Sequence, residues 1–329
     1  MRSRAALGLP AILAAVAFTS LREGEPGTIA YATPAGDVSQ LVTVRPDGGG
    51  RRVVVTARHR AFLGPVWSSD ARRLVFGLGR GLLVVSARGG RWQHVTAGAD
   101  SDPAVSPNGK WIAFVRTDST GAAVYAVHLD GTGLRRIADD AASFGDLSWA
   151  PDSKRLAATL VPAGSAWAGC PQVAVLQLAG ATNAVTHGCG LTPSWSPGGR
   201  RIAYVSTTAA TRTIAVVSAD GNSVGHVTPG PEDVDPLWSP DGGRIAFRHG
   251  RTLATARPDG TELRVLTHTR DSADAPAGWS PDGRRILFER FDPVEDFGIG
   301  QLLVTDVTAS AARRIARSVA LGSASWSSR

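Results

Sequence analysis

Lysine is almost absent from this chain of 329 residues. It occurs only at positions 110 and 154, so arginine supplies nearly all of the positive charge. The arginines are spread along the whole chain and form no basic run, which argues against a nucleic-acid partner despite a net charge of +7 and an isoelectric point near 10.3. Long polar tracts are also missing and apolar residues make up 43% of the sequence, which excludes a largely disordered chain.

A hydrophobic run long enough to span a membrane is missing as well. The N-terminal apolar stretch, residues 5–16, is short of the roughly 20 residues that a spanning helix needs, and Pro10 interrupts it. Arg2 and Arg4 precede this stretch and small residues follow it, which is typical of a signal peptide. We therefore expect a signal peptide at 1–17, a linker at 18–27 and export to the periplasm or the medium. Retention of the signal as an uncleaved anchor is the alternative.

What the sequence does contain is a repeat. Two segments are near copies of each other, WSPDGGRIAF at 238–247 and WSPDGRRILF at 279–288. Less similar copies of the same segment occur elsewhere along the chain. Successive copies start 38, 44, 46, 43, 41 and 47 residues apart, which is the period of a four-stranded propeller blade. We call the first residue of each copy the repeat position; it is occupied by Trp67, Val105, Trp149, Trp195, Trp238, Trp279 and Trp326.

Each copy predicts a β-hairpin. Ser-Pro-Asp-Gly suits a tight turn, because proline fixes φ at the second place and glycine accepts a positive φ at the fourth. An apolar strand follows each turn, and two further short strands separated by another glycine turn complete the unit. Short strands with frequent turns and no helical periodicity indicate an all-β protein.

The two ends of the repeat array predict how the ring closes. Residues 28–31 match the second strand of a unit whose inner strand is missing, and residues 323–328 supply one spare inner strand. Pairing these two segments would complete a first blade and remove two exposed sheet edges. We therefore predict one domain, 28–329, forming an all-β, seven-bladed β-propeller with four-stranded antiparallel blades.

The repeat resembles that of the TolB-like propellers, the proline-aspartate variant of the Trp-Asp repeat, over nearly the whole mature chain. TolB itself carries a separate α/β domain before its propeller, and residues 18–27 leave no room for one. The resemblance implies the fold strongly and the function weakly, since propellers carry many functions.

The strand order sorts the charged residues onto two faces of the predicted disc. The acidic face holds the loops that join fourth to first strands and second to third strands. Asp102, Asp146, Asp235 and Asp274 lie there, just before inner strands, and we expect them to crowd one mouth of the central channel. The basic face holds the remaining turns, which carry arginine pairs such as 72–73, 200–201 and 284–285. An acidic mouth favours a basic peptide or, alternatively, a calcium ion, whereas acids that only cap turns would bind nothing.

Two long loops of the acidic face carry aromatic residues, Trp167 and Phe297, which suit a protein interface or pack on their own blades. The only cysteines, Cys170 and Cys189, fall on this face too, and we expect a disulfide between them in an oxidising compartment. A metal site that adds His187 is conceivable but lacks a fourth ligand. We assign no metal or other cofactor.

The leading interpretation is a non-catalytic, monomeric scaffold that binds a protein or basic peptide on its acidic face. The alternative is a polysaccharide lyase or hydrolase related to the oligogalacturonate lyases, and a third is an accessory propeller for a separate peptidase or sensor. One enzyme motif occurs, Gly-Asn-Ser-Val-Gly at 221–225. It matches a hydrolase nucleophile pattern, but Ser223 is predicted in a hairpin rather than at a strand-to-helix elbow, so we reject it.

Overall fold

The computed structural model describes residues 27–327, apart from 59–61, 120, 163–169, 181, 185, 187, 209, 294–297 and 309–310. The predicted signal peptide and nearly all of the predicted linker lie outside this part. Within it the chain forms strands and turns but no helix, so no helical membrane span occurs among these residues.

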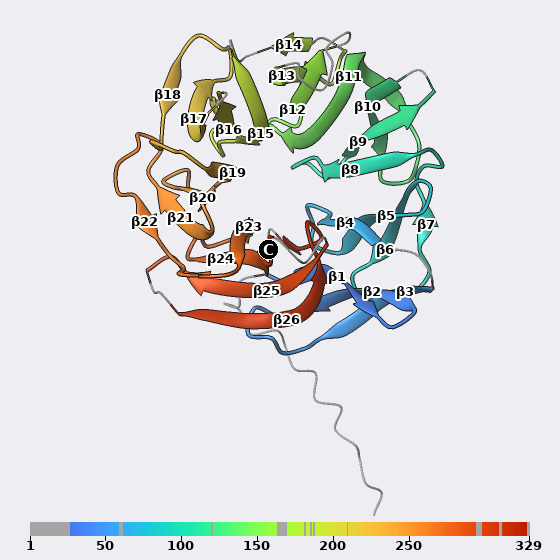
Figure 1. The fold of residues 1–329 in the computed structure, drawn as a ribbon. Helices are drawn as coiled ribbons and strands as arrows, with labels where there is room; N and C mark the ends of the chain where they lie inside the picture. The colour runs from blue at the N-terminus through green and yellow to red at the C-terminus, as the bar shows by residue number, and fades with distance from the viewer. Residues whose placement is uncertain are drawn as a thin grey trace, which may run out of the picture.

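Seven blades of four antiparallel strands stand around a central opening (Figure 1), as the repeat predicts. Blade 1 contains β27 (Ser325–Trp326), β1 (Ile29–Ala35), β2 (Val38–Val44) and β3 (Arg52–Arg58), and blade 2 contains β4 (Phe62–Trp67), β5 (Arg73–Leu78), β6 (Leu82–Ser86) and β7 (Gln93–His94). Blade 5 contains β15 (Cys189–Trp195), β16 (Arg201–Thr207), β17 (Arg212–Ser218) and β18 (Val224–His226). Blade 6 contains β19 (Asp233–Trp238), β20 (Ile245–His249), β21 (Thr252–Ala256) and β22 (Arg264–Val265), and blade 7 contains β23 (Ala273–Trp279), β24 (Arg285–Phe291), β25 (Ile299–Asp306) and β26 (Ala312–Ala320).

Blades 3 and 4 share one long strand, which the repeat does not predict. Blade 3 contains β8 (Asp100–Val105), β9 (Trp111–Asp118) and β10 (Gly121–His128), and blade 4 contains β12 (Arg155–Pro162), β13 (Gln172–Gln177) and β14 (Thr182–Ala184). The strand β11 (Arg135–Trp149) is the outer strand of the first and the inner strand of the second. Residues 139–144 contain neither proline nor glycine, so nothing in the sequence interrupts the extended backbone there.

The core lies between neighbouring blades. Phe76, Phe114, Phe247 and Phe288 occupy one equivalent place on the second strands and are completely buried. The tryptophans at the repeat position of blades 2, 4, 5, 6 and 7 are buried as well, each at 9% exposure or less. In one such cluster, Ala246 and Leu253 of blade 6 pack against Trp279 and Phe288 of blade 7. Because each blade buries its side chains against the next, the apolar surface that stabilises one blade also joins it to its neighbour.

The last residues of the described chain close the ring, as predicted. β27 pairs with β1, so that Trp326 lies opposite Ile29, and the N–H of Thr28 donates to Ser327 Oγ at 2.7 Å. Glu289 of β24 is buried and accepts N–H groups of the tail, from Gly322 at 2.7 Å and from Ala324 at 3.2 Å. Burial raises the pKa of the Glu289 carboxyl, and these amide hydrogen bonds oppose the rise. Blade 7 therefore holds the segment that completes blade 1.

Candidate functional site: an acidic channel

The inner strands of blades 2 to 6 bend at the third residue before the repeat position. The residues there are Gly64, Asp102, Asp146, Thr192 and Asp235, and all five have a positive φ, between 46° and 59°. The strand pairing shifts register at the same points. Aspartate tolerates this left-handed conformation, whereas a β-branched threonine is strained in it. At the bend, these side chains therefore no longer follow the regular pattern of a strand, in which successive side chains point to opposite faces of the sheet.

Three of these aspartates line one cavity in the channel. The cavity measures about 380 Å³ and is bounded by residues of β8, β11, β15, β19 and β23, the strands nearest the central opening in Figure 1. Its polar lining includes Asp102, Asp146, Thr192 and Asp235. Proline or leucine follows each of these four residues and completes an apolar wall. The channel thus presents carboxylates from three blades to one shared, open cavity.

Burial raises the pKa of the Asp102 carboxyl, and the negative charge of Asp146 raises it further. Burial also raises the pKa of Asp235, although Arg248 opposes this with its guanidinium Nε 3.6 Å from Asp235 Oδ2. Both shifts mean that the folded protein holds these negative charges at a cost. A cation that entered the cavity would offset that cost.

Hydrogen bonds fix the third carboxylate. The Thr159 hydroxyl donates to Asp146 Oδ2 at 2.7 Å and accepts the N–H of Thr192 at 3.1 Å. The Thr192 hydroxyl oxygen is itself buried and has no hydrogen-bond partner. This short network holds the carboxylate of one blade and the strained backbone of the next in fixed positions.

The fourth predicted aspartate, Asp274, does not line the cavity, so this part of the prediction is wrong. It lies five residues before the repeat position rather than three, is completely buried, and receives Nε and Nη2 of Arg290 at 2.7 and 2.8 Å. Asp100 makes the same bidentate pair with Arg116. In blade 6 the equivalent Asp233 contacts His249 Nδ1 at 2.6 Å. These three acids hold their own blades together.

The described residues offer no group of three or more histidine, cysteine or acidic side chains placed to hold a metal ion. Asp102, Asp146 and Asp235 come from separate blades, and calcium needs six to eight oxygen ligands at about 2.3–2.6 Å. Their arrangement suits an ammonium or guanidinium group on a flexible side chain better than a directly coordinated ion.

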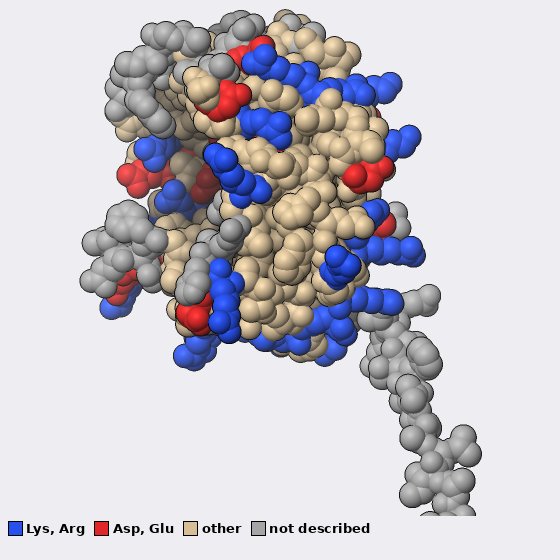
Figure 2. Space-filling view, turned by 90° about the vertical axis from the view of Figure 1, so that its right-hand side faces the viewer, with Lys and Arg blue, Asp and Glu red and all other residues tan. Residues whose placement is uncertain are grey.

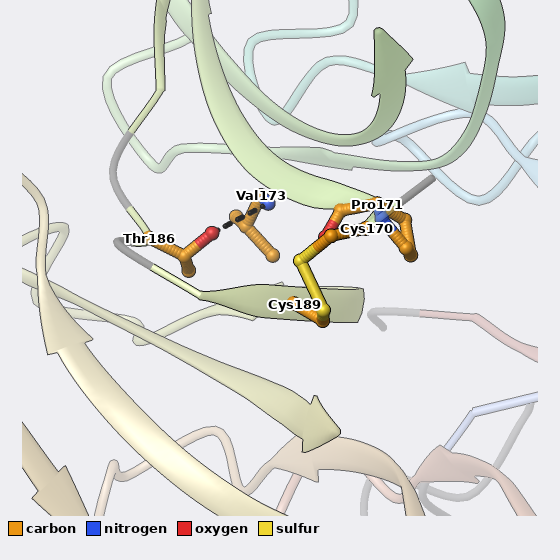
Figure 3. Close-up of a disulfide and its surroundings, with 5 residues drawn as sticks. All are labelled: Cys170, Pro171, Val173, Thr186 and Cys189. Atoms are coloured by element: carbon orange, nitrogen blue, oxygen red, sulfur yellow. Dashed lines mark hydrogen bonds between the residues drawn. A yellow bond between two sulfur atoms is a disulfide. The ribbon is translucent and has the colours of Figure 1, made fainter. Parts of the chain in front are cut away.

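Cys170 and Cys189 form a disulfide (Figure 3). It joins the residue before Pro171, at the start of the third strand of blade 4, to the first residue of β15. Next to the disulfide, the N–H of Gly190 donates to the Pro171 carbonyl at 2.8 Å. The N–H of Val173 donates to Thr186 Oγ1 at 3.1 Å (Figure 3). Neither of these two cysteines is therefore a free thiol. Trp167, Phe297 and His187 lie outside the described residues.

Aspartates of the basic face build turns. Hydrogen bonds from hydroxyl and backbone N–H groups lower the pKa of the carboxyl in Asp70, Asp130, Asp220, Asp241 and Asp259. The backbone N–H of Gly49 and the guanidinium of Arg45 lower the pKa of the Asp47 carboxyl. At Asp152 and Asp282 burial opposes the same kind of hydrogen bonds, and the pKa is still lowered. Ser223 lies in such a turn between β17 and β18, and its carbonyl accepts the N–H of Ser218. The hydrolase motif is therefore part of a hairpin.

Figure 2, an edge-on view of the disc, shows lysine and arginine side chains projecting from the right-hand side, while most of the visible acidic side chains lie toward the left. In this view the acidic side chains thus lie mostly on one side of the disc, whereas basic side chains occur on both sides.

Comparisons with known proteins agree with this architecture. A family model described as TolB beta propeller domain matches residues 145–329. TolB from Acinetobacter baumannii superposes with a TM-score of 0.55 at 14% identity, over 91% of this chain and 81% of that one. Oligogalacturonate lyase from Vibrio parahaemolyticus gives 0.62 at 14% identity, over 89% and 86%.

A puromycin-hydrolyzing peptidase from Mycobacterium tuberculosis gives a TM-score of 0.64 at 18% identity, over 89% of this chain and 54% of that one. No curated protein matches the sequence. At these identities the superpositions show a common fold, which both enzymes and TolB carry.

Proposed function

Because this chain belongs to the TolB β-propeller family, we propose that it is an exported, non-catalytic scaffold that holds a protein or basic peptide at its acidic channel. The observation that carries the proposal is the cavity in which Asp102, Asp146 and Asp235 converge. Each side chain comes from a different blade, so a ligand there would contact three repeats at once. Export is supported by the signal-like N-terminus and by the disulfide between the only two cysteines.

The physical basis is charge complementarity between the carboxylates that line the cavity and a cationic group of the ligand. Asp102 and Asp235 have raised carboxyl pKa values because of burial, so a lysine or arginine side chain that entered the cavity would relieve the repulsion there. The unpartnered hydroxyl oxygen of Thr192 could accept one further hydrogen bond from such a group.

The test is affinity capture from an envelope extract followed by a measured dissociation constant for the captured partner. Asp102→Asn, Asp146→Asn and Asp235→Asn combined should weaken binding by about 100-fold, since removing one side of desolvated charge pairs costs several kcal/mol. A matched control combines D37N, E232Q and D271N, which neutralise exposed acids of the same face outside the cavity. The proposal fails if the two triple variants bind the partner equally well.

The enzyme alternative has its own readout. The oligogalacturonate lyase likeness makes an acidic polysaccharide the substrate to offer, with ultraviolet absorbance of an unsaturated product as the signal. Turnover that the channel triple variant loses and the control retains would replace the scaffold proposal with a lyase.

A further inference from the structure

The basic face carries a ring of exposed cations at one equivalent place. Five residues after the repeat position, in the turn between first and second strands, stand Arg72, Lys110, Lys154, Arg200 and Arg284. We call these five residues the turn ring. It includes both lysines of the chain, and all five residues are exposed. Among the described residues, none of the five takes part in an ion pair.

A second layer of arginines lies beneath the turn ring. The next residue in four of the five turns is again arginine, and several of these guanidinium groups stack on the repeat tryptophan of the following blade. Arg155 lies 4.8 Å from the centre of the Trp195 ring, Arg201 lies 5.1 Å from that of Trp238, and Arg285 lies 5.8 Å from that of Trp326. Stacking fixes this layer against the disc. The turn ring therefore stands outward from a surface that is already positive.

The acids of the same turns do not cover the turn ring. Asp70 and Asp282 each accept the hydroxyl of the serine two residues earlier and the N–H of the residue two later. Asp152 accepts the N–H of Lys154 and the guanidinium of Arg155. These carboxylates face their own turns, and the two turns around Lys110 and Arg200 contain no acid.

The place where the chain enters the propeller indicates which kind of surface the turn ring contacts. Thr28 and Ser327 exchange hydrogen bonds at the first-to-second turn of blade 1, so the chain enters the disc on the basic face. Eleven residues, 17–27, separate the apolar residues 5–16 from Thr28, and they reach at most about 40 Å. Charges arranged in a ring on the flat side of a disc, rather than in a groove, match a planar array of negative groups.

We propose that the turn ring docks the protein on an anionic phospholipid surface. Juxtamembrane cations contribute about 1 kcal/mol each near such a surface. Docked in this way, the propeller turns its acidic channel away from the bilayer, toward a partner that approaches from the other side. The contact is peripheral and needs no spanning segment.

Vesicle flotation of the full chain tests the proposal. We expect binding to vesicles of phosphatidylglycerol and phosphatidylcholine to exceed binding to pure phosphatidylcholine. The excess should vanish between about 0.1 M and about 1 M NaCl, as the Debye length falls from about 10 Å to about 3 Å. The variant R72Q/K110Q/K154Q/R200Q/R284Q should lose about 1,000-fold or more in affinity for the anionic vesicles, because five contributions of this size add up.

The matched control carries the same loss of charge on the other face, R58Q/R80Q/R251Q/R270Q/R317Q, at five exposed arginines. It should keep the binding of the parent chain, and circular dichroism should show both variants folded. An equal loss in the two variants would show that net charge alone drives binding and would overturn the proposal. Tight binding of the parent chain to a soluble polyanion without binding to anionic vesicles would overturn it as well.

Discussion

The carboxyl groups of this protein fall into two kinds that a formal charge does not distinguish. In the turns, hydrogen bonds lower the pKa of each aspartate, and the charged form stabilises the fold. In the channel, burial raises the pKa of Asp102 and Asp235, and the charged form costs stability. A residue that destabilises the free protein is the kind expected where a ligand supplies the missing charge.

Exchanging Asp102 and Asp70 for asparagine should therefore have opposite effects. At neutral pH, Asp102→Asn removes a charge held at a cost and should raise the melting temperature by about 1–2 °C. Since the pKa of Asp102 is raised by folding, the advantage should shrink as the pH falls through that raised value. Asp70→Asn should lower the melting temperature by a similar amount, because the hydrogen bond from Ser68 lowers the pKa of Asp70.

Thermal melts at neutral pH and near pH 4 check both signs. The Asp70 difference should fade as the pH falls below the unfolded value of about 3.9. A loss of stability in Asp102→Asn at neutral pH would show that its charge is not held at a cost.

The sequence placed the aspartates on the correct strands but could not separate their roles. Asp235 and Asp274 both lie within an inner strand, β19 and β23, rather than just before it, and only the distance to the repeat position distinguishes them. That distance matters because the inner strand bends three residues before the repeat position, and a bend of this kind leaves no compositional signal beyond a following proline in most blades. In blade 7 the third residue before the repeat position is Pro276, which stays paired with Phe288, so this position supplies no carboxylate to the channel.

At the scale of paired strands, an aspartate of the inner strand lies opposite a basic residue of the second strand in blades 3, 6 and 7, and the basic residue differs in blade 6. Asp100 and Asp274 lie opposite Arg116 and Arg290, and both carboxylate oxygens of each are bonded. Between β19 and β20 the arginine is replaced by His249, which bonds only one oxygen of Asp233, and the other oxygen is buried without a partner. A buried acceptor left without a donor costs free energy.

Replacing His249 by arginine should complete this pair and stabilise the protein by about 1 kcal/mol. The reciprocal change, Arg290→His, should destabilise it by a similar amount. Urea unfolding of the two variants against the parent chain measures both. If His249→Arg destabilises the protein while remaining folded, the unpartnered oxygen is not the cost that the geometry indicates.

The strands could be predicted from the sequence wherever a turn separates one strand from the next. The Ser-Pro-Asp-Gly turns and the glycine turns predicted the hairpins of every blade, because these residues fix the backbone locally. The continuous β11 was not predictable, because whether residues 139–144 loop outward or stay extended is decided by pairing with β10 and β12. Local composition carries no information on that choice.

For the whole molecule, closure depends on very few residues. β27 contains two residues, and the ring of Trp326 packs with apolar residues of blades 1 and 7. Trp326→Ala should lower the free energy of unfolding by about 3 kcal/mol, as large core truncations do. Trp92→Ala is the matched control, because Trp92 is 41% exposed and lies outside the repeat, and it should cost less than about 1 kcal/mol. Equal costs in chemical unfolding would contradict a special role for the closing strand.

The meeting of both ends in one blade also sets an order of events during biosynthesis. Ser325 and Trp326 follow all the other strands of the propeller along the chain, and until they are synthesised β1 has an unpaired edge. A chain delivered from its N-terminal side therefore remains an open arc, and the ring closes only after β27 has emerged.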